Sequence, residues 1–146
     1  MAHLRKQIRE AIATAVTSLT TTGARVYQSR VYAIDSANLP CLAVYTDAET
    51  SEIETTNTPR ALYRTVSVKV EGRCRATADV DDTMDLICKE VEVALGTSTL
   101  SGLVYDLKLI STTSDISREA EQPTGLTVMT WFAEYRTSEN DPETSR

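Results

Sequence analysis

The alternation of apolar and polar side chains in residues 61–76, ALYRTVSVKVEGRCRA, limits the fold more than any other feature of the sequence. Val66, Val68 and Val70 are apolar, and the residues between and beside them, Thr65, Ser67, Lys69 and Glu71, are polar. A period of two places successive side chains on opposite faces of a β-strand. The segment therefore predicts a strand with one buried face and one solvent-facing face.

Other segments predict further strands around this one. They are residues 24–34, 41–47, 102–111 and 125–137. The last of them, GLTVMTWFAEYRT, is apolar on both faces. A strand of that kind belongs in the centre of a sheet or buries one face against another subunit.

Two amphipathic helices are predicted. Residues 3–20 place apolar side chains at three- and four-residue spacing, the period of one helix face: Leu4, Ile8, Ile12, Ala15, Val16 and Leu19. A second helix begins after Asp79, a favourable N-cap, and ends at Gly96, a favourable C-cap.

The length of 146 residues fits one domain. We expect an α+β fold, with a mixed or antiparallel sheet of about five to six strands packed against two amphipathic helices and an extended β-hairpin arm. The domain spans residues 1–136, and the polar segment 137–146 is expected to be disordered because it has little apolar surface to bury.

Composition excludes several classes of function. The net charge of −6 argues against a surface that neutralises nucleic-acid phosphates. The odd number of cysteines, Cys41, Cys74 and Cys88, favours buried neutral thiols in a reducing compartment. The sequence contains no signal-peptide pattern and no apolar run long enough to span a membrane, so we expect a protein made and used in a cytoplasm.

The sequence offers little catalytic or metal-binding chemistry. Residues 79–90, DVDDTMDLICKE, place carboxylates and a threonine at the ligand spacing of a calcium loop, but Met84 occupies the position where that loop needs glycine. A capped helix with an acidic face explains these residues more simply. His3 is the only histidine and has no cysteine or carboxylate at ligand spacing. We therefore predict no catalytic residue, no metal site, no cofactor and no enzyme activity.

The run NLPCLAVYTDAE, residues 38–49, resembles a pattern of the tail terminator proteins of long-tailed bacteriophages, the family of the lambda-type minor tail protein U. In that family a short amphipathic helix leads to a strand, a polar residue, the apolar motif and an acidic extension. Asp35 fits the polar position, and Asp47 and Glu49 fit the acidic extension. The apolar motif between them is matched by Leu39, Pro40, Leu42, Ala43, Val44 and Tyr45. The later order of strand, acidic-capped helix and two strands is also similar.

The resemblance implies a virion structural protein at the junction of tail and neck, assembled in the host bacterial cytoplasm. Its partners would be further copies of itself in a ring of about six, the tail tube protein and a head–tail connector protein. DNA would pass through the lumen without specific binding, because lumen carboxylates repel phosphates. No membrane is involved.

Residues 47–60, DAETSEIETTNTPR, have one aliphatic side chain and no face to bury, which suits an exposed arm. A closed ring repeats one contact between two different surfaces of the same chain. We expect the interface with another subunit or with the tube to include acidic and apolar arm residues and basic residues of the following strand. They are Glu49, Glu52, Ile53, Glu54, Arg60, Arg64, Arg73 and Arg75.

Two alternatives remain open at this point. One is another neck or head-completion connector protein, which would bind the portal side. The other is a small dimeric ligand-binding regulatory domain, in which the two-sided apolar strand would form the dimer. A solvated loop and a solvated strand face remain simple explanations for the arm and the basic residues.

Overall fold

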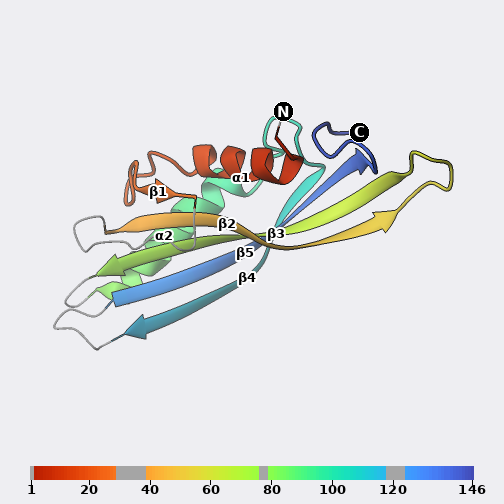
Figure 1. Ribbon diagram of the computed structural model, residues 1–146. Coiled ribbons are helices and arrows are strands. Elements are labelled where there is room, and N and C mark those ends of the chain that lie inside the picture. The colour runs from red at the N-terminus through yellow and green to blue at the C-terminus, as the bar shows by residue number, and fades with distance from the viewer. Residues whose placement is uncertain (1, 29–38, 76–78, 118–123) are drawn as a thin grey trace.

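The computed structural model describes residues 2–28, 39–75, 79–117 and 124–146. In these ranges the elements follow the order α1 (Leu4–Ala15), β1 (Val26–Tyr27), β2 (Cys41–Ile53), β3 (Ala61–Arg75), α2 (Val80–Leu95), β4 (Asp106–Ser117) and β5 (Thr124–Ser138). The strands form one five-stranded mixed sheet in the spatial order β1-β2-β3-β5-β4 (Figure 1). The predicted α+β class, with its two helices and long hairpin, is confirmed.

Strand pairing in the sheet is antiparallel except at β1, which runs parallel to the start of β2. The longest pairing joins β3 to β5 without interruption, from Ala61 opposite Ser138 to Arg75 opposite Thr124. The two-sided apolar strand predicted over 125–137 is β5, and it lies between β3 and β4 as a central strand would.

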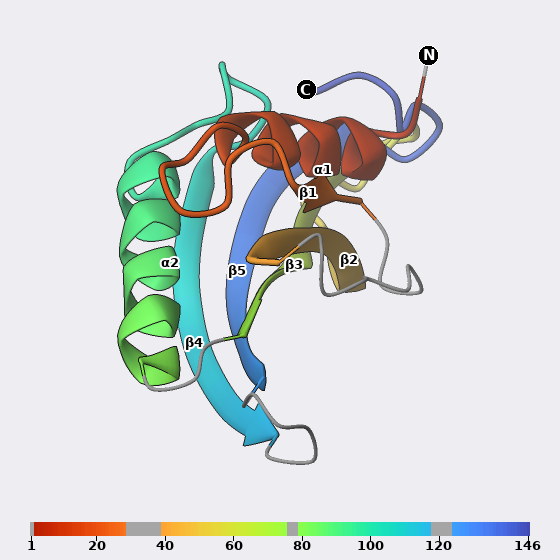
Figure 2. The same cartoon turned by 90° about the vertical axis from the view of Figure 1, so that its left-hand side faces the viewer.

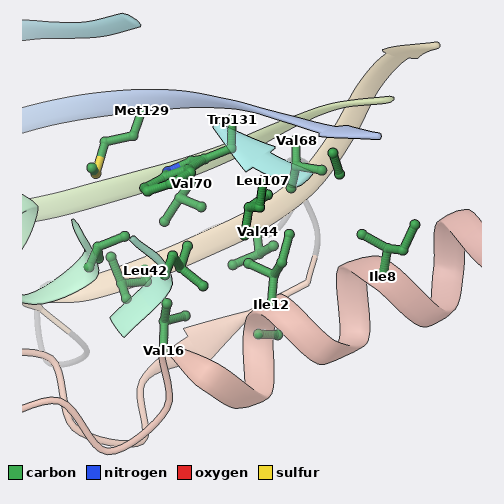
Figure 3. Close-up of a cluster of buried hydrophobic side chains, with 14 of the residues drawn as sticks. Ile8, Ile12, Val16, Leu42, Val44, Val68, Val70, Leu107, Met129 and Trp131 are labelled. Atoms are coloured by element: carbon green, nitrogen blue, oxygen red, sulfur yellow. The ribbon is translucent and has the colours of Figure 1, made fainter. Parts of the chain in front are cut away.

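One face of the sheet is covered by both helices. Leu4, Ile8 and Ile12 of α1 and Ile87 and Val91 of α2 are buried in the same apolar core. The sheet contributes side chains from alternate positions, which Figure 3 shows pointing toward α1 and the neighbouring strands: Leu42, Val44, Val68, Val70, Met129 and Trp131. Figure 2 shows α2 running alongside β4 and β5 and α1 lying across the end of the molecule near β1 and β2.

Two glycines let α2 approach the sheet closely. A Cβ at Gly72 would lie 2.8 Å from Ile87 Cγ2, and a Cβ at Gly125 would lie 2.7 Å from Val80 Cγ2. Both distances are shorter than real Cβ contacts, so a side chain at either position would push the helix away from the sheet.

The first helix is shorter than predicted. It ends at Ala15 rather than near residue 20, and Ser18 in the following turn has a left-handed φ of 68°. Threonines occupy positions 17 and 20–22, and β-branched residues favour helices less than the residues of α1. The strand predicted over 24–34 is confirmed only as β1, since residues 29–38 lie outside the described ranges.

The strand predicted over 102–111 begins later and ends later than expected, as β4. Leu100, Ser101 and Gly102 all have positive φ, so the chain turns there and cannot yet be extended. The second half of β4, TTSDIS, is polar and exposed except for Ile116, so one apolar residue is too little to show the alternation by which a strand is recognised.

The second helix begins and ends where predicted. Asp79 is its N-cap and Gly96 its C-cap, although the Asp79 side chain makes no capping hydrogen bond. Asp81 and Asp82 lie in the first turn, where the helix dipole favours negative charge. The calcium-loop template residues from Asp81 onward are therefore ordinary helix positions.

The C-terminal segment differs from the disordered tail expected over 137–146. Strand β5 includes Thr137 and Ser138, and the chain then folds back toward α1. The backbone N–H of Leu4 donates to Pro142 O at 2.8 Å, and Gln7 Nε2 donates to Glu143 O at 3.0 Å. Backbone acceptors hold this segment, so its lack of apolar side chains does not prevent it from packing.

Candidate functional site

The outer part of the β2–β3 hairpin is the most prominent projection of the fold. We call residues 49–66 the arm; Figure 1 shows it extending beyond the helices at the end of the sheet near both termini. Its β2 side is mostly solvent-exposed, and Ile53 has 65% of its surface exposed. Strand β5 pairs with the β3 side as far as Ala61, so the arm is three strands wide and supported along its length.

A buried ion cluster anchors the arm to the body. The Glu49 side chain is only 7% exposed and accepts hydrogen bonds from Arg5 Nη1 at 3.2 Å and Arg64 Nη1 at 3.4 Å. The hydroxyl of Tyr135 on β5 also donates to Glu49. This carboxylate therefore joins α1, β3 and β5 at the base of the arm, which fixes the direction in which the arm leaves the sheet.

A β-bulge brings Glu49 to this position. Thr46 pairs with Val68 and Glu49 pairs with Val66, so Asp47 and Ala48 together lie opposite Ser67. The extra residue shifts the alternation by one and turns Glu49 to the helix-covered face, the side on which Arg64 lies. Without the bulge, Glu49 would face the opposite side of the sheet.

The anchor perturbs the protonation of Tyr135. Burial, followed by the hydrogen bond to Glu49, raises the pKa of the Tyr135 phenol well above its ordinary value of 10.0. At the other end of the cluster, His3 Nδ1 accepts the backbone N–H of Arg5 at 3.1 Å, and burial and the Arg5 charge lower the pKa of His3. Both groups are therefore neutral at neutral pH.

The raised pKa of Tyr135 predicts a loss of stability in alkali. The unfolded chain loses this proton near pH 10 and the folded chain only at higher pH, so the stabilisation is complete below pH 10 and declines as pH rises above it. At pH 11 the contribution lost is about 1 kcal/mol. Urea unfolding at pH 8 and pH 11 measures it. The Tyr135→Phe variant, which lacks the titrating group, should lose less stability over the same range, and an equal loss in both proteins would contradict the prediction.

A second set of contacts holds the outer part of the arm. Arg136 Nε lies 2.7 Å from Glu54 Oε1, and the Arg136 guanidinium lies 5.2 Å from the Tyr63 ring centroid and 4.8 Å from that of Tyr105. Arg60 Nη1 lies 3.4 Å from Glu139 Oε2. The arm is thus tied to β5 and to the segment after it, in addition to the strand pairing.

These contacts divide the eight predicted interface residues into two groups. Glu49 pairs with Arg64, Glu54 with Arg136, and Arg60 with Glu139, all within the same chain. Glu52 and Ile53 remain exposed on the arm. Arg73 is partly exposed and pairs with Glu71 at 3.1 Å, and Arg75 is exposed at the end of β3.

The two exposed groups lie at opposite ends of the sheet. Ile53 is opposite Leu62 near the start of β3, whereas Arg73 and Arg75 lie at its end. Eleven strand positions separate Leu62 from Arg73, a distance of roughly 36 Å at ~3.3 Å per residue. Exposed arm residues and these arginines therefore cannot meet within one chain.

The residues that resemble the terminator motif form the buried start of β2. Leu42, Ala43 and Val44 are fully buried, and the Tyr45 hydroxyl donates to Glu71. Pro40 O accepts a hydrogen bond from Arg25 Nε at 2.7 Å. Asp35 lies outside the described residues. The motif is thus a packing element that connects β1, β2 and β3.

The described part of the chain shows a structural cluster and no catalytic constellation. Cys41 and Cys74 are buried, as predicted, and Cys88 is partly buried. Burial raises the pKa of Cys41 to about 11 and also raises the pKa values of Cys74 and Cys88, so these thiols are protonated at neutral pH. No group of three or more His, Cys, Asp or Glu side chains in the described ranges could hold a metal ion. Neither described helix has the length and apolarity to cross a membrane.

Fold and site together define an α+β domain with a braced, projecting arm. No family model matches the chain, and no curated protein sequence matches it. Among solved structures, the chain is similar to a chain described as "Virion of native gene transfer agent (GTA) particle". The two share 15% sequence identity, the alignment covers 90% of this chain and 92% of that one, and the TM-score is 0.40.

Proposed function

We infer that the protein is a virion structural protein, a tail terminator that caps the end of the tail tube as a ring of about six copies. The ring stops tube polymerisation, presents a face to the head-side connector and lets DNA pass through without specific binding. The sequence pattern around Pro40–Tyr45 supports the family, and the exposed arm supports assembly through a repeated contact.

The observation that carries the proposal is the separation of two unlike surfaces along β3. Exposed arm residues, with Ile53 as an apolar anchor and Glu52 beside it, lie at one end, and Arg73 and Arg75 lie at the other. Since they cannot meet within a chain, contact between them joins different copies. A contact between two different surfaces is heterologous, and its repetition forms a ring when the rotation from copy to copy closes.

We propose different roles for the remaining predicted residues, based on their ion pairs within the chain. Glu49 and Arg64 are side chains of the anchor at the base of the arm, and Glu54 and Arg60 hold its outer part. Their part in assembly is to keep the arm in one orientation, which lowers the entropy lost when a neighbouring copy binds. Glu52, Ile53 and Arg75 make the contact itself, and Arg73, which pairs with Glu71 of its own chain, lies beside Arg75 on β3.

Tube growth in the presence of the purified protein tests this function. We expect the wild-type protein to halt elongation of tubes assembled from purified tube protein and to form rings visible at tube ends by negative-stain microscopy. Ile53→Asp should raise the concentration needed roughly tenfold or more, because a charge replaces the anchor in the contact. Ile53 and the control residue Val93 on α2 are 65% and 79% exposed, so we expect both aspartate variants to stay folded.

The Val93→Asp control should cap tubes as well as the wild type. Tubes that lengthen unchanged in saturating wild-type protein would contradict the terminator function. Binding to isolated portal complexes together with unchanged tube growth would instead favour a neck or head-completion connector.

A further inference from the structure

We propose that two copies of this chain pair through the outer edges of their β4 strands, around a two-fold axis at Thr112, and so join their sheets into one. This contact goes beyond the proposed ring and uses a different surface, since the arm and the basic end of β3 take no part in it.

Strand β4 ends the sheet and leaves one edge exposed. It pairs with β5 on one side, and in the described ranges no strand pairs with its other side (Figure 1). Nine of its twelve residues are exposed, and no proline interrupts the strand. An exposed edge presents backbone N–H and C=O groups that can pair with another strand.

Hydrogen bonds at the two ends of β4 show which residues face this edge. Leu107 N donates to Asp106 Oδ1, and Ile116 N donates to Asp115 Oδ1, both at 2.9 Å. These two amides are therefore not bonded to β5. Along a strand, every second residue directs its backbone N–H and C=O groups toward the same neighbouring strand. Between Leu107 and Ile116, the residues opposite every second β5 position therefore direct these groups away from β5, toward the open edge. They are Leu109, Thr112 and Ser114, opposite Trp131, Met129 and Thr127.

The bulge in β4 makes the outward-facing positions symmetric. Leu109 pairs with Trp131 and Ser111 with Thr130, so Ile110 is an extra residue. When distance from Thr112 is counted by the β5 partners, Leu107 and Ile116 lie equally far from it on opposite sides. Leu109 and Ser114 do so as well. With a two-fold axis at Thr112, two copies of β4 run antiparallel, and each residue whose backbone groups face the open edge lies opposite another such residue. A hydrogen-bonded ladder requires this arrangement.

The same register matches the side chains. On the face away from the helices, Lys108 lies opposite Phe132 and Asp115 opposite Leu126. The two-fold register places Lys108 of one copy directly across from Asp115 of the other, twice by symmetry, and places Leu107 across from Ile116 on the other face. Opposite charges and apolar pairs directly across from each other stabilise antiparallel strands. Shifting the axis to Ser111, Thr113 or Ser114 loses the charge pairing.

The helices leave room for the joined sheet. Helix α2 packs over β3 and β5, so about four strand spacings, roughly 19 Å, would separate the two α2 helices. Helices need only ~10 Å between their axes. The occupant of the edge is thus a second copy of the chain, selected by self-complementary register and charge.

Cross-linking at the axis tests the register. In a hydrogen-bonded antiparallel pair the two Thr112 Cα atoms would lie ~5.5 Å apart, within reach of a disulfide or a short thiol–thiol reagent. We expect Thr112→Cys to give a covalent dimer in high yield, and Ser117→Cys, at the exposed end of the same strand, to give little. The unsubstituted chain measures the background from Cys41, Cys74 and Cys88. A head-to-tail ring contact does not bring residue 112 of two copies together, so the two kinds of contact are distinguished.

Charge reversal tests the pairing. Light scattering of the wild-type protein should show a dimer, and Lys108→Glu or Asp115→Lys should each raise the dimer dissociation constant roughly tenfold. The double variant should restore wild-type affinity. Either of two results would overturn the proposal: a wild-type chain that stays monomeric up to millimolar concentration, or a dimer whose Thr112→Cys form does not cross-link more than Ser117→Cys.

Discussion

Replacing Glu49 with alanine is expected to lower the free energy of unfolding by about 3 kcal/mol, because removal of one partner from a buried ion pair leaves the other charge uncompensated. The Arg64 side chain is only 10% exposed, and Tyr135 is fully buried. Both would lose their acceptor at once. Urea unfolding followed by circular dichroism measures the change, which corresponds to a fall in Tm of roughly 10 °C.

Two companion variants separate charge from packing. Glu49→Gln keeps the shape and two of the possible acceptor bonds, and its loss should be smaller than that of the alanine variant. Glu52→Ala removes a carboxylate from an exposed position of the same strand and should change stability by less than ~0.5 kcal/mol. Equal losses at Glu49 and Glu52 would show that the cluster does not anchor the arm.

The Trp131→Ala variant should lose about 4 kcal/mol, because it removes the largest side chain of the core and leaves a cavity. Trp131 is 2% exposed on β5, opposite Val68 of β3 and Leu109 of β4. Figure 3 shows its ring close to Val70 in the core, and the strands on either side cannot close the space without changing their pairing. Denaturant unfolding followed by circular dichroism measures the loss, since the variant has no tryptophan for fluorescence.

The next residue on the strand supplies the matched comparison. Phe132 faces the side of the sheet that α1 and α2 do not cover and is only partly buried. We expect Phe132→Ala to cost less than half as much as Trp131→Ala. A larger loss at Phe132 than at Trp131 would mean that the open face of the sheet contributes more to stability than the helix-covered core.

The elements with a clear period were predictable from sequence. The alternating valines of β3, the stripe of α2 and the apolar length of β5 each bury a face in the core, and burial is what creates the period. Strand β4 was placed too early because its first half makes most of its core contacts. Only Ile116 of the mostly polar second half packs against the core, and pairing with β5 keeps that half extended. Pairing of that kind leaves no pattern in the sequence.

The anchor of the arm could not be predicted for a different reason. Glu49 and Arg64 were expected at a surface between copies, since an acidic segment followed by arginines is typical of an exposed contact. The bulge at residues 46–49 decides which face Glu49 occupies, and neither its existence nor its position follows from the side chains. Arg5 and Tyr135 are distant from Glu49 in sequence. The β3–β5 register brings Tyr135 to Glu49, and the position of α1 on the sheet brings Arg5 to it. No local signal would have identified them.

The folding back of the C-terminal segment onto α1 has a consequence for the topology of the chain. Leu4 and Gln7 are hydrogen-bonded to Pro142 and Glu143, and Figure 1 shows the two termini next to each other at the end of the molecule from which the arm projects. A few added residues could therefore close the backbone into a circle without breaking a strand pair. A peptide fused to either terminus would leave the protein from this same place, and in a closed assembly every copy would present its fusion around one rim.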